Sequence, residues 1–198
     1  MSTATVTPPP APPVPPPAAR MTAEEFGIKH SGDHVEYIDG EVKEVLMAGG
    51  KHGIVTNWVG YYLTQHAVAT QSGRVFATDT FVKVPTKDDP DRVYGADVCY
   101  VSYSRLSKEA EVPDGVIPVT PDLVVEVRSP FDTWSNVIAK MLDYIRAGVP
   151  VVVILDPKTR SASVFRNQDR QDIFEADEIL TVPDVLPGFA VSVASLFV

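Results

Sequence analysis

The segment VVVILD, from Val151 to Asp156, constrains the fold of this chain more than any other segment. It is an unbroken run of β-branched and aliphatic residues, which is typical of a strand that is buried on both faces of a sheet. A strand of that kind needs other elements to cover it on each side. The sequence therefore predicts a central sheet with helices on both faces, an α/β or mixed α+β fold.

Three segments predict helices that could cover such a sheet. Thr22 to Phe26 (TAEEF) opens with a capping box, and His52 to Thr70 carries apolar residues at helical spacing. The third helix is expected over residues 133–147, with Asp132 as its N-cap and Gly148 as the residue that ends it.

Further strands are expected around these helices. The segment VEYIDGEVKEV, residues 35–45, reads as two short strands joined by a turn at Asp39 and Gly40, a strong hairpin signal. The remaining strands are predicted at residues 74–84, 96–101, 121–127, 151–156 and 161–166. A short helix near residues 191–197 ends the pattern, which favours one central mixed sheet.

Composition bounds the organisation of the chain. Residues 2–19 form a proline-rich tract that cannot pack a core, so we expect a disordered tail over residues 1–20 and one domain over residues 21–198. No run of about 18 apolar residues is present, which argues against a membrane-spanning helix. A single cysteine, Cys99, and the lack of a signal-peptide pattern indicate a reducing, cytoplasmic location.

The net charge of −9 limits the functions that fit this chain. Proteins that bind nucleic acid nonspecifically usually carry a basic surface, so tight nonspecific binding of DNA is not expected. A few Lys or Arg side chains on one face would still suffice for a local phosphate track.

Two acids inside apolar strands are the strongest functional signal. Glu126 interrupts PDLVVEVRSP, and Asp97 interrupts ADVCYV. Asp122 shares the strand face of Glu126 but lies about 13 Å from it at roughly 3.3 Å per residue, too far to share a metal ion. Asp97 and Glu126 on adjacent strands would repel each other unless a cation such as Mg²⁺ or Mn²⁺ lay between them. Alternatively, each pairs separately with an arginine or with backbone donors.

Two cations are expected near Glu126. Arg128 follows it by two residues, on the same strand face at about 7 Å. Lys140 lies on the flank of the apolar stripe of the predicted helix, beside Tyr144, from where it can reach over the sheet toward Glu126. The alternative for Lys140 is an ordinary solvated lysine.

Five motifs occur in an order that resembles a known family. They are DGE at residues 39–41, ADVCYV at 96–101, PDLVVEVRSP at 121–130, KMLDYIRAGV at 140–149 and VVVILDP at 151–157. Over residues 21–198 the chain is similar to the Uma2 family of restriction-endonuclease-like proteins, in the PD-(D/E)XK nuclease superfamily. The resemblance implies a central mixed sheet flanked by helices and metal-dependent cleavage of phosphodiester bonds in DNA.

The resemblance also implies site residues. Asp97 and Glu126 match the two acids that bind Mg²⁺ or Mn²⁺, and the carbonyl of Val127 would be a further ligand. Arg128 replaces the usual lysine; because it keeps its charge, it can stabilise phosphate but cannot act as a base. Lys140 matches a lysine supplied from the helix, which would orient the attacking water and stabilise developing charge. Nucleases of this superfamily often act as dimers, so the resemblance allows a homodimer.

Other residues and other functions stay open. Glu41, at the exposed hairpin, resembles the DGE context of the family and is a candidate to line the site. His52 is a candidate proton shuttle, although an exposed polar role is more common at a helix start. Cys99 is expected to pack as a small residue. The alternatives to a nuclease are a catalytically inactive module that binds DNA or another partner, and a hydrolase of a nucleotide or small phosphoester.

Overall fold

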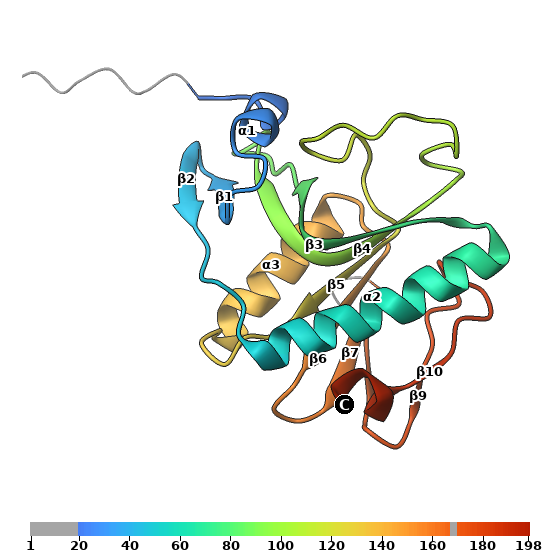
Figure 1. The fold of residues 1–198 in the computed structure, drawn as a ribbon. Helices are drawn as coiled ribbons and strands as arrows, with labels where there is room; N and C mark the ends of the chain where they lie inside the picture. The colour runs from blue at the N-terminus through green and yellow to red at the C-terminus, as the bar shows by residue number, and fades with distance from the viewer. Residues whose placement is uncertain (1–19, 167–169) are drawn as a thin grey trace, which may run out of the picture.

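An eight-stranded mixed sheet forms the centre of the molecule, with strand order β2-β1-β4-β5-β6-β7-β8 and with β3 paired to β4 (Figure 1). The computed structural model describes residues 20–166 and 170–198, so the tail predicted over residues 1–20 lies outside the described residues except for Arg20. The prediction of a mixed sheet flanked by helices is confirmed.

The central strands follow the pattern of the sequence. The strands of the large sheet are β1 Val35–Ile38, β2 Glu41–Glu44, β3 Gly73–Lys83, β4 Val93–Ser102, β5 Leu123–Val127, β6 Val151–Asp156, β7 Ser161–Phe165 and β8 Gln171–Phe174. Two short strands, β9 (Ile179–Leu180) and β10 (Val191–Ser192), pair separately. Every residue of β6 is buried, as its continuous apolar run predicts. β5 and β6 pair in parallel, whereas the other described strand pairs are antiparallel.

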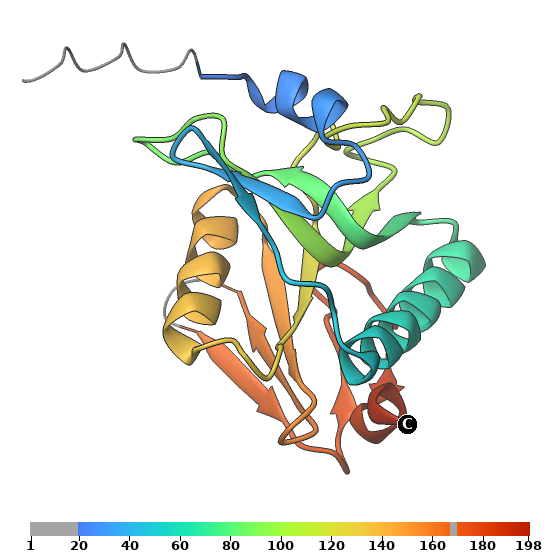
Figure 2. The ribbon, with the colours of Figure 1, turned by 60° about the vertical axis from the view of Figure 1, so that its left-hand side comes forward.

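Helices cover both faces of this sheet (Figure 2). α2 (Gly50–Thr70) and the short 3₁₀ helix η1 (Val193–Phe197) lie on one face, and α3 (Trp134–Arg146) lies on the other. α1 (Ala23–Lys29) packs beside β1, where the rings of Phe26 and Tyr37 stack at 5.2 Å. In the described part of the chain, no helix has the length and apolarity that a membrane crossing requires.

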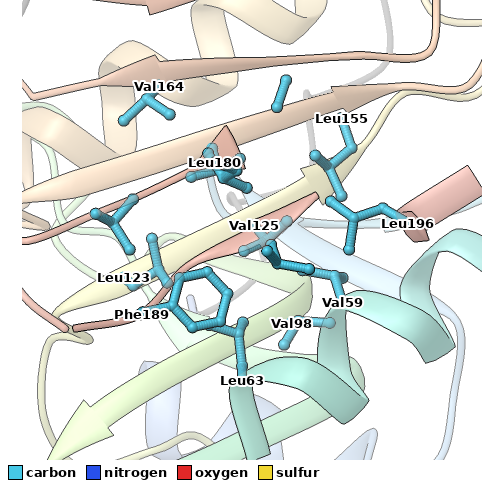
Figure 3. Packing of buried hydrophobic residues seen from close by; sticks show 14 of the residues in the cluster. Val59, Leu63, Val98, Leu123, Val125, Leu155, Val164, Leu180, Phe189 and Leu196 are labelled. Atoms are coloured by element: carbon cyan, nitrogen blue, oxygen red, sulfur yellow. The ribbon is translucent and has the colours of Figure 1, made fainter. Parts of the chain in front are cut away.

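The largest core lies between the sheet and α2 (Figure 3). The labelled side chains come from α2 (Val59, Leu63), from strands β4 to β7 (Val98, Leu123, Val125, Leu155, Val164) and from the C-terminal segment (Leu180, Phe189, Leu196). Burying each side chain of this size stabilises the fold by about 1.5–3 kcal/mol. The C-terminal segment therefore completes the core that α2 begins.

The start of α3 differs from the prediction, and its end agrees with it. Thr133 is the N-cap rather than Asp132, because Oγ1 of Thr133 accepts the N–H of Asn136 at 3.3 Å. Asp132 accepts the N–H of Ser129 at 2.8 Å and closes the turn that precedes the helix. Gly148 follows the last turn with φ +94°, a left-handed conformation that favours glycine.

Several other element ends differ from the sequence pattern. α2 and β4 begin earlier than predicted. β5 begins later because Asp122 leaves the strand to accept hydrogen bonds from the Ser102 N–H at 2.8 Å and from Arg105 Nε at 2.7 Å. The helix predicted near residues 191–197 is β10 followed by the 3₁₀ helix η1.

Replacing Leu63 with alanine should lower the free energy of unfolding by about 2–5 kcal/mol, because the change leaves a cavity between α2 and the sheet. Leu63 is 1% exposed, whereas Val68 on the same helix is 69% exposed. Val68→Ala is the matched control and should change stability by less than about 0.5 kcal/mol. Urea unfolding measures both variants, and equal losses would contradict the packing of α2.

Candidate active site

β4 and β5 place Asp97 and Glu126 on neighbouring strands. Val98 pairs with Val125 in the antiparallel register, so the next residues along the two strands are Asp97 and Glu126. The N–H of Val127 donates a hydrogen bond to Oδ2 of Asp97 at 2.6 Å, and Asp97 is only 6% exposed. The predicted adjacency of the two acidic strands is confirmed.

Lys140 brings a positive charge to Glu126 from α3. Its Nζ lies 3.2 Å from Oε2 of Glu126 and 2.9 Å from Oε1 of Glu36 on β1. It also donates a hydrogen bond to the carbonyl oxygen of Gly95 at 3.0 Å. The buried face of α3 packs on the sheet and holds this flank side chain over the strands. The expectation that Lys140 reaches Glu126 is confirmed, and the alternative of a solvated lysine is wrong.

Tyr144 holds the other oxygen of Glu126. Its hydroxyl donates to Oε1 of Glu126 at 2.7 Å, and it lies one helical turn after Lys140, on the same side of α3. Burial raises the pKa of Glu126 to about 8 against the opposing charge of Lys140, and the Asp97 carboxylate adds to the rise. Because Lys140 already lies beside Glu126, a further cation bound there would favour the charged form of this carboxylate.

The charges of this centre set the protonation states of Lys140 and Tyr144, which both donate hydrogen bonds to Glu126. Burial disfavours the charge of Lys140, but Glu126 and Glu36 outweigh it, so the pKa of Lys140 lies above its ordinary value. Burial, and after it the charge of Glu126, raises the pKa of Tyr144 well above its ordinary value. Lys140 therefore stays an ammonium, and Tyr144 keeps the proton that it donates.

His52 approaches Asp97 from the first turn of α2. Its Nε2 lies 3.2 Å from Oδ2 of Asp97, and its Nδ1 lies 3.4 Å from the hydroxyl of Thr56. The side chain is 13% exposed, so the expectation of an exposed polar residue is wrong. Burial works against protonation of His52, but the hydrogen bond to Asp97 and the charges of nearby carboxylates together outweigh it and raise the pKa of the imidazole. A role in proton transfer stays a prediction.

A bulge in β3 brings Asp79 to the same region. Thr78 and Asp79 form the bulge, and together they stand opposite Asp97 on β4. Both have left-handed backbone, with φ 65° and 55°, which costs about 1–3 kcal/mol for a residue other than glycine. Burial raises the pKa of Asp79, the charge of Asp97 adds to the rise, and Lys140 opposes it. The sequence did not single out Asp79, because its position depends on the bulged pairing of β3 with β4, which the residue pattern alone does not fix.

Comparison with known proteins supports this picture. Residues 21–194 match the Uma2 family, which is described as "Putative restriction endonuclease". The chain belongs to the Uma2 family. No curated protein matches the chain.

One solved structure that this Uma2 chain resembles is that of "a putative nuclease belonging to DUF820 from Anabaena variabilis ATCC 29413". The two share 22% sequence identity with a TM-score of 0.73, over 89% of this chain and 97% of that one. This likeness shows that the fold is the one seen in that protein. The family assignment supports a nuclease function, and both agree with the resemblance seen in the motifs.

Arg128, which the resemblance places where a lysine is expected, lies just beyond the end of β5. β5 ends at Val127, and the Arg128 guanidinium pairs with Oδ2 of Asp156 at 2.8 Å. It also donates to the carbonyl of Asp132 at 3.2 Å and lies 4.9 Å from the centre of the Trp134 ring. These contacts join β5 to β6 and to the start of α3. A part for Arg128 in binding phosphate stays a prediction.

Glu36, rather than Glu41, is the hairpin acid that contacts the centre. Glu41 is exposed on β2, whereas Glu36 on β1 pairs with Lys140. No pattern in the sequence singles out Glu36, because its contact with Lys140 depends on where β1 lies relative to α3. Cys99 is fully buried in the core, and burial raises the pKa of its thiol, so the expectation of a packed residue is confirmed.

The acids of the centre suit a hard cation, although they form no complete cage. Across residues 20–166 and 170–198, no group of three or more His, Cys, Asp or Glu is placed to hold a metal ion. Mg²⁺ usually takes only one or two protein carboxylates and keeps several waters, which Asp97 and Glu126 fit. Each carboxylate offers about four lone pairs. The contacts from Val127 and His52 to Asp97, and from Tyr144 and Lys140 to Glu126, therefore leave lone pairs for a cation.

Tyr144→Phe should lower the free energy of unfolding by about 1–3 kcal/mol, because a buried oxygen of Glu126 loses its donor. Tyr61 is 50% exposed, and Tyr61→Phe is the control, with an expected change below about 0.5 kcal/mol. Urea unfolding at neutral pH measures both variants. Unchanged stability of Tyr144→Phe would mean that the hydroxyl does not hold Glu126.

Proposed function

We propose that this Uma2 chain is a metal-dependent endonuclease that hydrolyses phosphodiester bonds in DNA. One observation carries the proposal: two acids from neighbouring strands meet the ammonium of Lys140, which lies 3.2 Å from Glu126 and is held there by Glu36. The family assignment supports the same reaction class. Since one such centre cuts one strand, cleavage of a duplex would use a homodimer.

Mg²⁺ or Mn²⁺ is the proposed cofactor, held by Asp97, Glu126 and the carbonyl of Val127. When bound, such an ion makes water a nucleophile near neutral pH and neutralises charge on the phosphate. The choice of a hard cation follows from the donors, which are all oxygen atoms.

The chain's own residues position these groups. His52 and the Val127 N–H both contact Oδ2 of Asp97, which fixes the direction of that carboxylate. Tyr144 does the same for Glu126. The ammonium of Lys140 faces the same carboxylate, where it would stabilise negative charge that develops on the phosphate. Arg128, which pairs with Asp156, would stabilise charge on the phosphate but would not act as a base.

A catalytically inactive module that binds DNA or another partner is the second candidate. The observation that favours it is the pairing of Lys140 with both Glu126 and Glu36, which compensates part of their charge without a metal ion. The net charge of −9 also disfavours tight binding of a duplex. Cleavage assays separate the two candidates, because substituting Asp97 or Glu126 can abolish cleavage only if the chain is an enzyme.

Asp97→Asn and Glu126→Gln should each reduce cleavage of a supercoiled plasmid at least about a hundredfold in Mg²⁺ or Mn²⁺, because each removes a proposed ligand of the metal ion. EDTA should abolish cleavage by the wild type, and added Mg²⁺ should restore it. Asp177→Asn, on an exposed turn, is the control with the same change of charge and should cut normally. Equal cleavage by all the proteins would point to a contaminating nuclease and reject the site.

A further inference from the structure

A cavity of about 260 Å³ lies beside the candidate centre, and the proposed reaction gives it no role. It is half open to solvent and is lined by residues 31–34, by residues 76–81 around the bulge of β3, and by residues 112–115 and 117. Phe76, Val112 and Ile117 supply apolar wall, and His34 and Asp79 supply polar groups. Cavities that hold drug-sized ligands usually measure about 300–1,000 Å³, so this one suits a single flat ring system.

Asp79 connects this cavity to the candidate centre. Gly95 packs directly on Asp79, since a Cβ added to Gly95 would lie 3.5 Å from the Cβ of Asp79. The carbonyl of the same Gly95 accepts the hydrogen bond of Lys140. Lys140 in turn contacts Glu126. A group bound at Asp79 would therefore lie next to the residues proposed to cut the phosphodiester bond.

An acceptor and an imidazole stand side by side in the cavity wall. Oδ2 of Asp79 and Nδ1 of His34 are 3.7 Å apart, which is longer than a hydrogen bond, and the two side chains are 45% and 50% exposed. An ionised carboxylate only accepts hydrogen bonds. Asp33 and Asp114 also line the cavity, so the cavity disfavours phosphate and favours a ligand that offers N–H donors.

The bulge of β3 is what turns Asp79 into this position. A regular strand would not need two successive left-handed residues at Thr78 and Asp79. Bulges often redirect a side chain next to a functional site, and strained backbone of this kind is common at functional sites.

We propose that this cavity receives one unpaired nucleobase of the strand to be cut, with Asp79 accepting a hydrogen bond from the exocyclic amino group of the base. This proposal rests on the nuclease function proposed above. The apolar wall suits the faces of the ring, and the carboxylate suits its amino edge. Cytosine, adenine and guanine carry such a group. Thymine has a carbonyl oxygen in place of the amino group of cytosine, and its ring N3–H is its one donor, so it should bind Asp79 more weakly.

The test compares two fluorescent single strands, oligothymidylate and the same strand with one central cytidine. Binding is measured by anisotropy in EDTA, so that no strand is cut. The wild type should bind the cytidine strand about five- to tenfold more tightly, the effect of one hydrogen bond to a charged acceptor. In Asp79→Asn this ratio should fall below about twofold, because the amide offers a donor as well as an acceptor.

Two features of the design tie the ratio of the two affinities to the side chain of Asp79. Asparagine also tolerates left-handed backbone, so the bulge should persist in Asp79→Asn. Asp88→Asn, on an exposed loop, removes the same charge and should keep the full cytidine preference. A general gain in affinity from the lost negative charge cancels in the ratio.

Each outcome decides one proposal. No binding, equal binding of the two strands by the wild type, or an unchanged ratio in Asp79→Asn would overturn the base pocket. A cytidine preference that depends on Asp79, without cleavage in Mg²⁺ or Mn²⁺, would keep the pocket and reject the nuclease function. Cleavage without that preference would reject the pocket alone.

Discussion

The rest of this centre depends on the contacts that the ammonium of Lys140 makes. It joins α3 to three strands through Glu126 on β5, Glu36 on β1 and the carbonyl of Gly95 on β4. Carboxylates held out of water in this way would repel each other, and an uncompensated buried charge typically costs about 3–5 kcal/mol. Lys140 therefore stabilises the same arrangement of acids that a catalytic centre would use.

The chain order makes this convergence possible. β5 and β6 run in parallel, so the chain has to cross over between them, and α3 is that crossover. The crossover returns Lys140 to Glu126 on the strand that precedes it. The antiparallel pairing of β4 with β5 brings Asp97 to the same place, and α2, on the opposite face of the sheet, adds His52. Residues far apart in the sequence thus meet at one end of the paired region of β4 and β5.

The pattern of residues in the sequence predicted those parts of the site that lie on regular strands and helices. Acids within apolar strands identified Asp97 and Glu126, and helical spacing put Lys140 within reach. It could not predict contacts set by tertiary packing. The burial of His52 depends on where α2 crosses the sheet. The contact of Glu36 with Lys140 depends on how the β1–β2 hairpin is placed relative to α3, and the position of Asp79 depends on the bulge in β3. Likewise, competing local hydrogen bonds decided that Thr133, not Asp132, caps α3.

The most direct test of the proposed centre is a crystal structure of this Uma2 chain grown with Mn²⁺, with the ion located by its anomalous scattering. The proposal predicts one Mn²⁺ peak bound by carboxylate oxygens of both Asp97 and Glu126, at about 2.0–2.3 Å from each. Substituting Glu126 with glutamine should remove that peak. A wild-type crystal with no Mn²⁺ between these two acids, while Lys140 still pairs with Glu126 and Glu36, would contradict a metal-dependent centre here.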